Sequence, residues 1–143
     1  MKESASWTLR CDGGSRGNPG PGASGYVLID PAGKEVESRG EFLGPVTNNV
    51  AEYRALLAGL EAATRLSARP LEIRMDSELV VRQMTGEYRV KNQGLKALHA
   101  AACRAASALG AVRFVAVPRE ENAQADRLVN ETLDRVLGSE SPR

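Results

Sequence analysis

The sequence has few of the residues that hold small secreted domains together. Only 2 of its 143 residues are cysteine, Cys11 and Cys103, and they match no paired metal-binding spacing such as Cys-x-x-Cys. We therefore expect two reduced thiols, although spacing alone does not show whether they approach each other. Aromatic residues make up 4% of the chain. The one histidine, His99, lies in a stripe of leucine and alanine, which predicts a helix-surface residue rather than a catalytic one.

An excess of charge of one sign and long apolar runs are also missing. The net charge is +1, from 19 Lys and Arg against 18 Asp and Glu, so any nucleic-acid site must be a local patch. No run approaches about 18 apolar residues, and residues 1–6 lack the apolar core of a secretion signal. We expect a cytoplasmic monomer without a membrane partner. One domain is predicted over residues 7–137, between flexible ends at 1–6 and 138–143.

Alternating apolar and polar residues predict five strands, of which the first three form an antiparallel meander. The strands are expected at 7–12, 26–29, 35–42, 71–75 and 112–116. The first ends in Asp12 at the lip of a glycine-rich turn, and the fourth ends just before Asp76. In the third strand, Val36 and Phe42 fall on the face that we expect to be half-buried.

Apolar residues three and four positions apart predict four helices. The helices are expected from near Val50, over 77–85, over 95–109, and after Asn122 as N-cap. Glu52 and Asp126 then fall in the first turns of the first and last helices, where the helix dipole favours a carboxylate. The element order is βββαβααβα, an α/β fold with a mixed sheet and helices packed on it.

Four carboxylates occupy equivalent places in this order. Asp12 and Asp76 lie at strand ends, and Glu52 and Asp126 lie at helix starts, so one cleft can receive all four. Each alone has an ordinary structural explanation, such as turn formation or the helix dipole. Together they would repel one another unless protons or hard cations separate them, which favours Mg²⁺ or Mn²⁺ over zinc.

Four motifs around these acids resemble type 1 ribonuclease H, and the likeness runs from about Leu9 to Leu137. The motifs are Asp12-Gly-Gly-Ser-Arg-Gly-Asn-Pro-Gly, Thr47-Asn-Asn-Val-Ala-Glu-Tyr, Met75-Asp-Ser-Glu-Leu-Val and Glu121-Asn-Ala-Gln-Ala-Asp. The resemblance implies the ribonuclease H-like fold, with three antiparallel strands followed by two parallel ones. It also implies endonucleolytic hydrolysis of the RNA strand of an RNA–DNA hybrid, leaving 5′-phosphate and 3′-hydroxyl ends.

The same resemblance places Asp12, Glu52, Asp76 and Asp126 on the family's metal-binding acids, which hold two Mg²⁺ ions with Mn²⁺ as a substitute. Asp12 corresponds to the bridging acid, Glu52 and Asp76 flank the ion that activates water, and Asp126 holds the other ion. The family's substrate contacts fall on small residues, several of which are also ordinary turn or cap residues. They are Gly13, Gly14, Asn48 and Asn49, with Glu52, for the RNA strand, and Asn18, Thr47 and Asn92 for the DNA strand and phosphates.

Two features depart from the family pattern. Ala116 stands where many members have a histidine about ten residues before the last aspartate, and Arg119 is the nearest polar candidate for an auxiliary role. Arg119 cannot titrate near neutrality, so it is a poor general acid. The basic protrusion is missing, because only Gly86–Gly94, with Arg89 and Lys91, separates two helices. We therefore expect a thin grip on the substrate.

Two other functions are compatible with such a fold. One is a nucleic-acid-binding module without catalysis, which the presence of all four acids disfavours. The other is a different nuclease, integrase or transposase acting on duplex DNA, which the Asn48-Asn49 pair before Glu52 disfavours. The sequence leaves open the cleavage-site preference, the preferred metal, the oligomeric state, any further domain, and whether Arg119 replaces the histidine.

Overall fold

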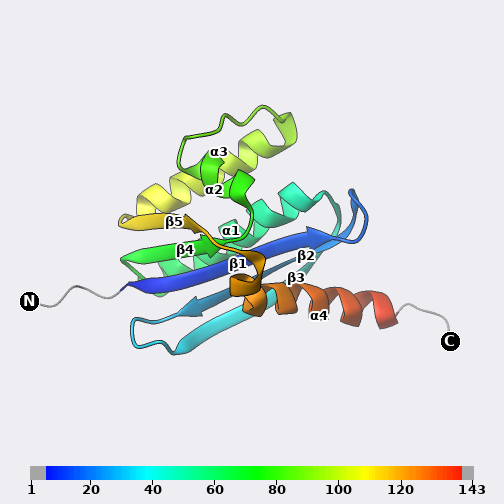
Figure 1. Cartoon of the computed structure of the whole chain (residues 1–143), viewed down its shortest axis with the longest axis horizontal. Coiled ribbons are helices and arrows are strands. Elements are labelled where there is room, and N and C mark those ends of the chain that lie inside the picture. The colour runs from blue at the N-terminus through cyan, green and yellow to red at the C-terminus, as the bar shows by residue number, and fades with distance from the viewer. Residues whose placement is uncertain (1–5, 140–143) are drawn as a thin grey trace, which may run out of the picture.

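The five strands form one mixed sheet in the order β3-β2-β1-β4-β5 in a computed structural model that describes residues 6–139 (Figure 1). β1 pairs antiparallel with β2 and parallel with β4, β2 pairs antiparallel with β3, and β4 pairs parallel with β5. The strands are β1 Trp7–Ser15, β2 Gly20–Ile29, β3 Glu35–Val46, β4 Leu71–Met75 and β5 Val112–Ala116. The predicted meander followed by two parallel strands is confirmed.

Helices cover both faces of this sheet. They are α1 Asn48–Arg65, α2 Glu78–Met84, α3 Gln93–Leu109 and α4 Ala123–Ser139, with a short 3₁₀ helix η1 at Arg119–Asn122. α1 packs on β1 and β2 and against α3, whereas α4 packs on β1, β2 and β3 from the opposite face (Figure 1). The predicted element order βββαβααβα is therefore confirmed, with η1 as an addition. No helix within residues 6–139 is both long and apolar enough to cross a membrane.

Each face of the sheet has its own apolar core. Leu9 and Cys11 of β1 are fully buried in the larger core, with α1 and α3, while Ala23 of β2 packs against Val129 and Leu133 of α4. Successive residues of a strand point to opposite faces. The side chain of Asp12, next to Cys11, therefore points away from the larger core and toward the α4 side.

The edge strand β3 is more exposed than its alternation predicts. Val36 and Phe42 each keep 39% of their surface exposed, so the expected half-buried face is wrong at these two positions. β3 is an edge strand of the sheet, and α4 approaches it at Gly40, where an added Cβ would collide with Thr132. Val36 and Phe42, on either side of this contact, remain exposed.

Three local predictions fail near the C-terminal helix and the cysteines. Asn122 is not an N-cap: it is buried in η1, its Nδ2 donates to the Cys11 carbonyl at 2.8 Å, and its Oδ1 has no hydrogen-bond partner among the described residues. α4 continues through residues 138–139, which we expected in a flexible tail. His99 was expected on the helix surface but is half-buried. Its Nε2 lies 3.1 Å from the Gln83 carbonyl oxygen and 3.4 Å from the Cys103 sulfur.

Two further expectations concern the cysteines and the ends of the chain. Both cysteines are free, with Cys11 buried and Cys103 half-buried. The flexible ends predicted for residues 1–5 and 140–143 lie outside the described residues.

A pair of glycine substitutions tests how closely α4 packs on the sheet. In Gly25→Ala the new Cβ would lie 2.9 Å from both the Ala125 carbonyl oxygen and the Leu128 Cβ, so α4 must shift. We expect a loss of about 1–3 kcal/mol in the free energy of unfolding, measured by urea denaturation. Gly138→Ala, with no heavy atom within 4 Å of the new Cβ, is the matched control and should be neutral or stabilising. Equal stability of the two variants would contradict this packing.

Candidate active site

Glu52 reaches the sheet because α1 passes unusually close to β1. A Cβ on Gly13 would collide with the carbonyl group of Ala51, so only glycine permits this approach. The Gly13 N–H then donates to Glu52 Oε1 at 3.1 Å. Glu52 lies in the second turn of α1, since the helix already begins at Asn48, and its predicted place in the first turn is wrong. Its position is therefore explained by the Gly13 contact rather than by the helix dipole.

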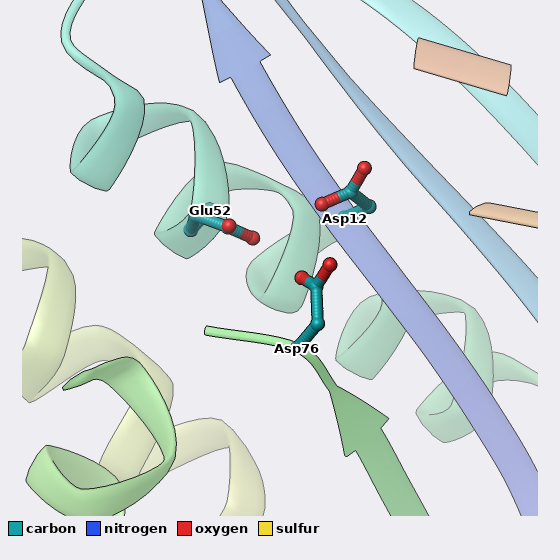
Figure 2. A group of neighbouring side chains, drawn as sticks. All are labelled: Asp12, Glu52 and Asp76. Atoms are coloured by element: carbon teal, nitrogen blue, oxygen red, sulfur yellow. The ribbon is translucent and has the colours of Figure 1, made fainter. Parts of the chain in front are cut away.

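Asp12 and Asp76 lie just beyond the same end of the ladder that joins the parallel strands β1 and β4. The β1–β4 ladder pairs Trp7 through Arg10 of β1, so Asp12 lies just beyond it, and Asp76 directly follows the last residue of β4. Asp12 is within β1, opposite Gly25 of β2, rather than at the end of the strand as predicted. One carboxylate oxygen from each of Asp12, Glu52 and Asp76 lies within 4.8 Å of the other two, and the three side chains point into one space (Figure 2).

Asp126 joins this group from the other face of the sheet. It lies in the first turn of α4, as predicted, and it lines the same cleft as Asp12, whose pKa its negative charge raises. Asn130, one helical turn later, donates from Nδ2 to Asp126 Oδ2 at 3.3 Å. The structure thus brings all four predicted acids to one cleft of about 480 Å³.

The cleft also contains residues that sequence reasoning missed. Ser15 is the last residue of β1, Arg16 follows it in the turn to β2, and Asn130 comes from α4. Asn130 could have been found, because it lies four residues after Asp126 and so on the same helix face. No sequence pattern marked Arg16 as a site residue, since glycine-rich turns often carry a solvent-exposed arginine or lysine.

Burial and mutual repulsion favour the protonated forms of Asp12, Glu52 and Asp76. Burial is the largest cause that raises the pKa of Asp12, to about 8, and the negative charges of Asp76 and Asp126 raise it further. Burial, then the charges of Asp12 and Asp76, raise the pKa of Glu52 well above its usual range. The pKa of Asp76 is also raised, mainly by burial. A divalent cation would replace these protons, and a set of carboxylate oxygens suits Mg²⁺ or Mn²⁺.

Arg119 lies at the rim of the acid cluster. Its Nε is 3.8 Å from Asp76 Oδ2, while 82% of its side chain is exposed. Its positive charge lowers the pKa of Asp76 and of Glu52, opposing the effect of burial. Ala116, at the position of the missing histidine, is the last residue of β5 and does not line the cleft.

Several of the predicted substrate contacts organise the turn beside the acids. Asn48 lines the cleft, and its Oδ1 accepts a hydrogen bond from the Ser15 N–H at 2.9 Å. Asn18 Oδ1 in turn accepts from the Asn48 N–H at 2.9 Å, and Thr47 is the N-cap of α1. These hydrogen bonds tie the β1–β2 turn to the start of α1.

The remaining predicted contacts lie in different surroundings. Gly13 and Gly14 line the cleft, and Asn49 is exposed on the first turn of α1. Asn92 does not line the cleft; its Oδ1 caps α3 by accepting from the Gly94 and Leu95 N–H groups. Residues 85–92 alone connect α2 to α3, which confirms that no additional helix is inserted there.

The raised pKa values predict how stability depends on pH in the absence of metal. The folded protein holds protons that the unfolded chain releases, so the free energy of unfolding should fall as pH rises from about 4 to about 8. We expect a fall on the order of 5 kcal/mol by urea denaturation in a chelator, with Asp12→Asn removing much of it. Glu131→Gln, an exposed acid of α4, is the control and should keep the fall. A flat profile for the unsubstituted protein would contradict the repulsion.

Comparison with known proteins places this site in a family. A family model described as "Reverse transcriptase-like" matches residues 10–132. The chain is 44% identical over 133 residues to "Bifunctional protein Rv2228c" of Mycobacterium tuberculosis, a match that covers 92% of this chain and 36% of that protein. It is 42% identical over 123 residues to "Ribonuclease HI" of Halobacterium salinarum, covering 86% of this chain and 62% of the relative. The chain thus spans about a third of the first relative and less than two thirds of the second.

Two solved structures share the whole architecture. The N-terminal RNase H domain of the mycobacterial protein superposes with a TM-score of 0.89 at 38% identity, covering 96% of this chain and 100% of that one. LC11-RNase H1, isolated from compost by a metagenomic approach, was solved in complex with an RNA/DNA hybrid. It superposes with a TM-score of 0.87 at 42% identity and covers 92% of this chain and 99% of that one.

Proposed function

The chain belongs to the type 1 ribonuclease H family, and from this premise we propose that it cleaves the RNA strand of RNA–DNA hybrids, leaving 5′-phosphate and 3′-hydroxyl ends. The observation that carries the proposal is the convergence of Asp12, Glu52 and Asp76 within 4.8 Å, with Asp126 lining the same cleft. Relatives described as ribonuclease HI, and one solved with a hybrid, support the choice of substrate.

The four acids fit a pair of hard divalent cations. When bound, such a pair polarises the scissile phosphate and stabilises charge on the attacking and leaving oxygens of an in-line displacement. We propose Mg²⁺ as the cation, with Mn²⁺ as a substitute. Asp12 shares the cleft with Asp76 and Asp126, and the charges of both raise its pKa, so it is the acid that we propose would serve both cations.

The other acids are held by different partners, which supports separate roles. Glu52 is oriented by the Gly13 N–H and, with Asp76, belongs on the side of the attacking water. Asp126 is oriented by Asn130 and belongs on the side of the leaving oxygen. Arg119 supplies a positive charge beside Asp76. There it would contact a phosphate of the substrate or help the product to dissociate.

Selection of the RNA strand requires contacts to the 2′-hydroxyl group. Gly13, Gly14 and Asn48 line the cleft beside the acids, and Asn49 is exposed next to them, so we propose these four residues as the reader of the RNA strand. Small neutral donors suit sugar and phosphate oxygens. Asn18, Thr47 and Asn92 remain proposals for the DNA strand and its phosphates. We also retain the cytoplasmic location and the monomeric state as predictions.

The proposal is tested by incubating the purified protein with end-labelled hybrid, duplex RNA and duplex DNA, with and without Mg²⁺. We expect Mg²⁺-dependent cleavage of the RNA strand of the hybrid alone. Asp12→Asn should lower the rate by at least about 10³-fold, because it weakens the acid shared by both cations.

Controls separate this result from loss of the fold and from the other functions. Asp12→Asn should unfold at the same or a higher temperature without metal, because the substitution relieves repulsion. His99→Ala should keep the wild-type pH dependence of the rate, since His99 does not line the cleft. Tight hybrid binding without cleavage would instead support a non-catalytic module, and cleavage of duplex DNA would support another nuclease of this fold.

A further inference from the structure

Arg16 lies at the rim of the cleft, on the turn that joins β1 to β2. Among the described residues that line the cleft, Arg16 and Arg119 carry the positive charges, against four carboxylates. Arg119 lies beside Asp76, whereas Arg16 reaches α4 on the Asp126 side. A polyanionic strand entering this cleft therefore meets one cation at each side of the acid cluster.

The guanidinium of Arg16 is held through one nitrogen. Nη2 lies 2.8 Å from Asp134 Oδ1, 3.4 Å from Asn130 Oδ1 and 3.5 Å from the Asn130 carbonyl oxygen. Within residues 6–139, Nε and Nη1 of Arg16 have no hydrogen-bond partner. An arginine has five N–H donors in a planar fork, so three of them remain available to a ligand beside the acids.

Asp134 holds Arg16 only weakly. The two side chains are 69% and 41% exposed, and ion pairs between exposed groups contribute little to stability. A phosphodiester offers two non-bridging oxygens, which share one negative charge and match the guanidinium fork better than the single Asp134 oxygen does. Exchange of the carboxylate for a phosphate would thus cost little and would give Arg16 a stronger partner.

Asn130 fixes the place of this cation relative to the reaction. It donates to Asp126 through Nδ2 and accepts from Arg16 through Oδ1. Asp126, Asn130 and Asp134 are spaced four residues apart on α4, so they lie along one face of the helix. The side chain of Asn130 therefore links Arg16 to Asp126, one of the four acids.

We propose that Arg16 binds a backbone phosphate of the RNA strand next to the cleaved one, and that Asp134 occupies its guanidinium until the strand arrives. This inference rests on the proposed function and assigns a phosphate subsite within it. Asp134 then acts as a competitor of the substrate, and its removal should tighten binding rather than weaken it.

The test compares Arg16→Ala, Asp134→Asn and the double variant in hybrid cleavage at saturating Mg²⁺. We expect Arg16→Ala to raise KM about three- to tenfold with kcat within about twofold, because the variant no longer binds a non-reacting phosphate. Asp134→Asn should lower KM about twofold. In the Arg16→Ala background, Asp134→Asn should leave KM unchanged. If the Asp134 carboxylate instead acted only by repelling the substrate, Asp134→Asn would lower KM in this background as well. Arg16→Lys should restore part of the binding, since the charge remains but the planar fork does not.

Matched variants control for charge and stability. Arg104→Ala on α3 and Glu131→Gln on α4 remove the same charges from exposed residues outside the cleft, and both should leave KM unchanged. Thermal unfolding of each variant separates loss of binding from loss of structure. If Arg16 and Asp134 only join the turn to α4, both substitutions should lower stability, and Asp134→Asn should not lower KM. That result, or an unchanged KM in Arg16→Ala, would overturn the proposal.

A binding measurement keeps this proposal separate from the proposed function. Fluorescence anisotropy of labelled hybrid, with Ca²⁺ in place of Mg²⁺ and the strands verified as intact, should show weaker binding by Arg16→Ala. The slope of log affinity against log salt should fall in magnitude by about 0.9, because the variant neutralises one phosphate fewer. Wild-type protein that binds hybrid but does not cleave it would contradict the function, while the binding series would still decide the role of Arg16. Protein that binds no hybrid would overturn both.

Discussion

Repulsion among buried carboxylates is the constraint on which the rest of this structure depends. Asp12, Glu52 and Asp76 come from three elements, yet their oxygens lie within 4.8 Å of one another, and burial removes the water that would screen them. Without a cation the group persists by holding protons, as the pKa of about 8 for Asp12 shows. The fold therefore maintains an arrangement that is unfavourable by itself and becomes favourable when divalent cations bind.

The scaffold achieves this by bringing backbones close together at the carboxyl ends of parallel strands. Gly13 lets α1 approach β1 so that the Gly13 N–H holds Glu52, and Gly25 lets α4 approach β2 so that Asp126 reaches Asp12. These approaches come from opposite faces of the sheet, so each of the two apolar cores positions part of the site. The packing that stabilises the fold and the geometry that binds cations are thus the same set of contacts.

Sequence periodicity predicted those features that depend only on the strand or helix in which a residue lies. The strand and helix order, Asp76 after β4 and Asp126 in the first turn of α4 all follow from local patterns. Features that depend on a partner elsewhere in the chain were missed or wrong. Asn122 was expected as a cap, but it bonds to the carbonyl of Cys11, 111 residues away. The exposure of Val36 and Phe42 follows from the place of β3 at the edge of the sheet, and the ion pair between Arg16 and Asp134 joins a turn to the last helix.

The central claim is that protons on this acid cluster give way to divalent cations, and calorimetry tests it most directly. Mg²⁺ is titrated into the protein near pH 7 in two buffers with different enthalpies of ionisation, and the difference in heat gives the number of protons released. With the pKa of Asp12 at about 8, this carboxyl is mostly protonated near pH 7, so we predict release of at least about one proton per molecule, with Glu52 as a further source. Asp12→Asn should lower this release by about one proton. Binding of Mg²⁺ with the same heat in both buffers, and so without proton release, would contradict the account.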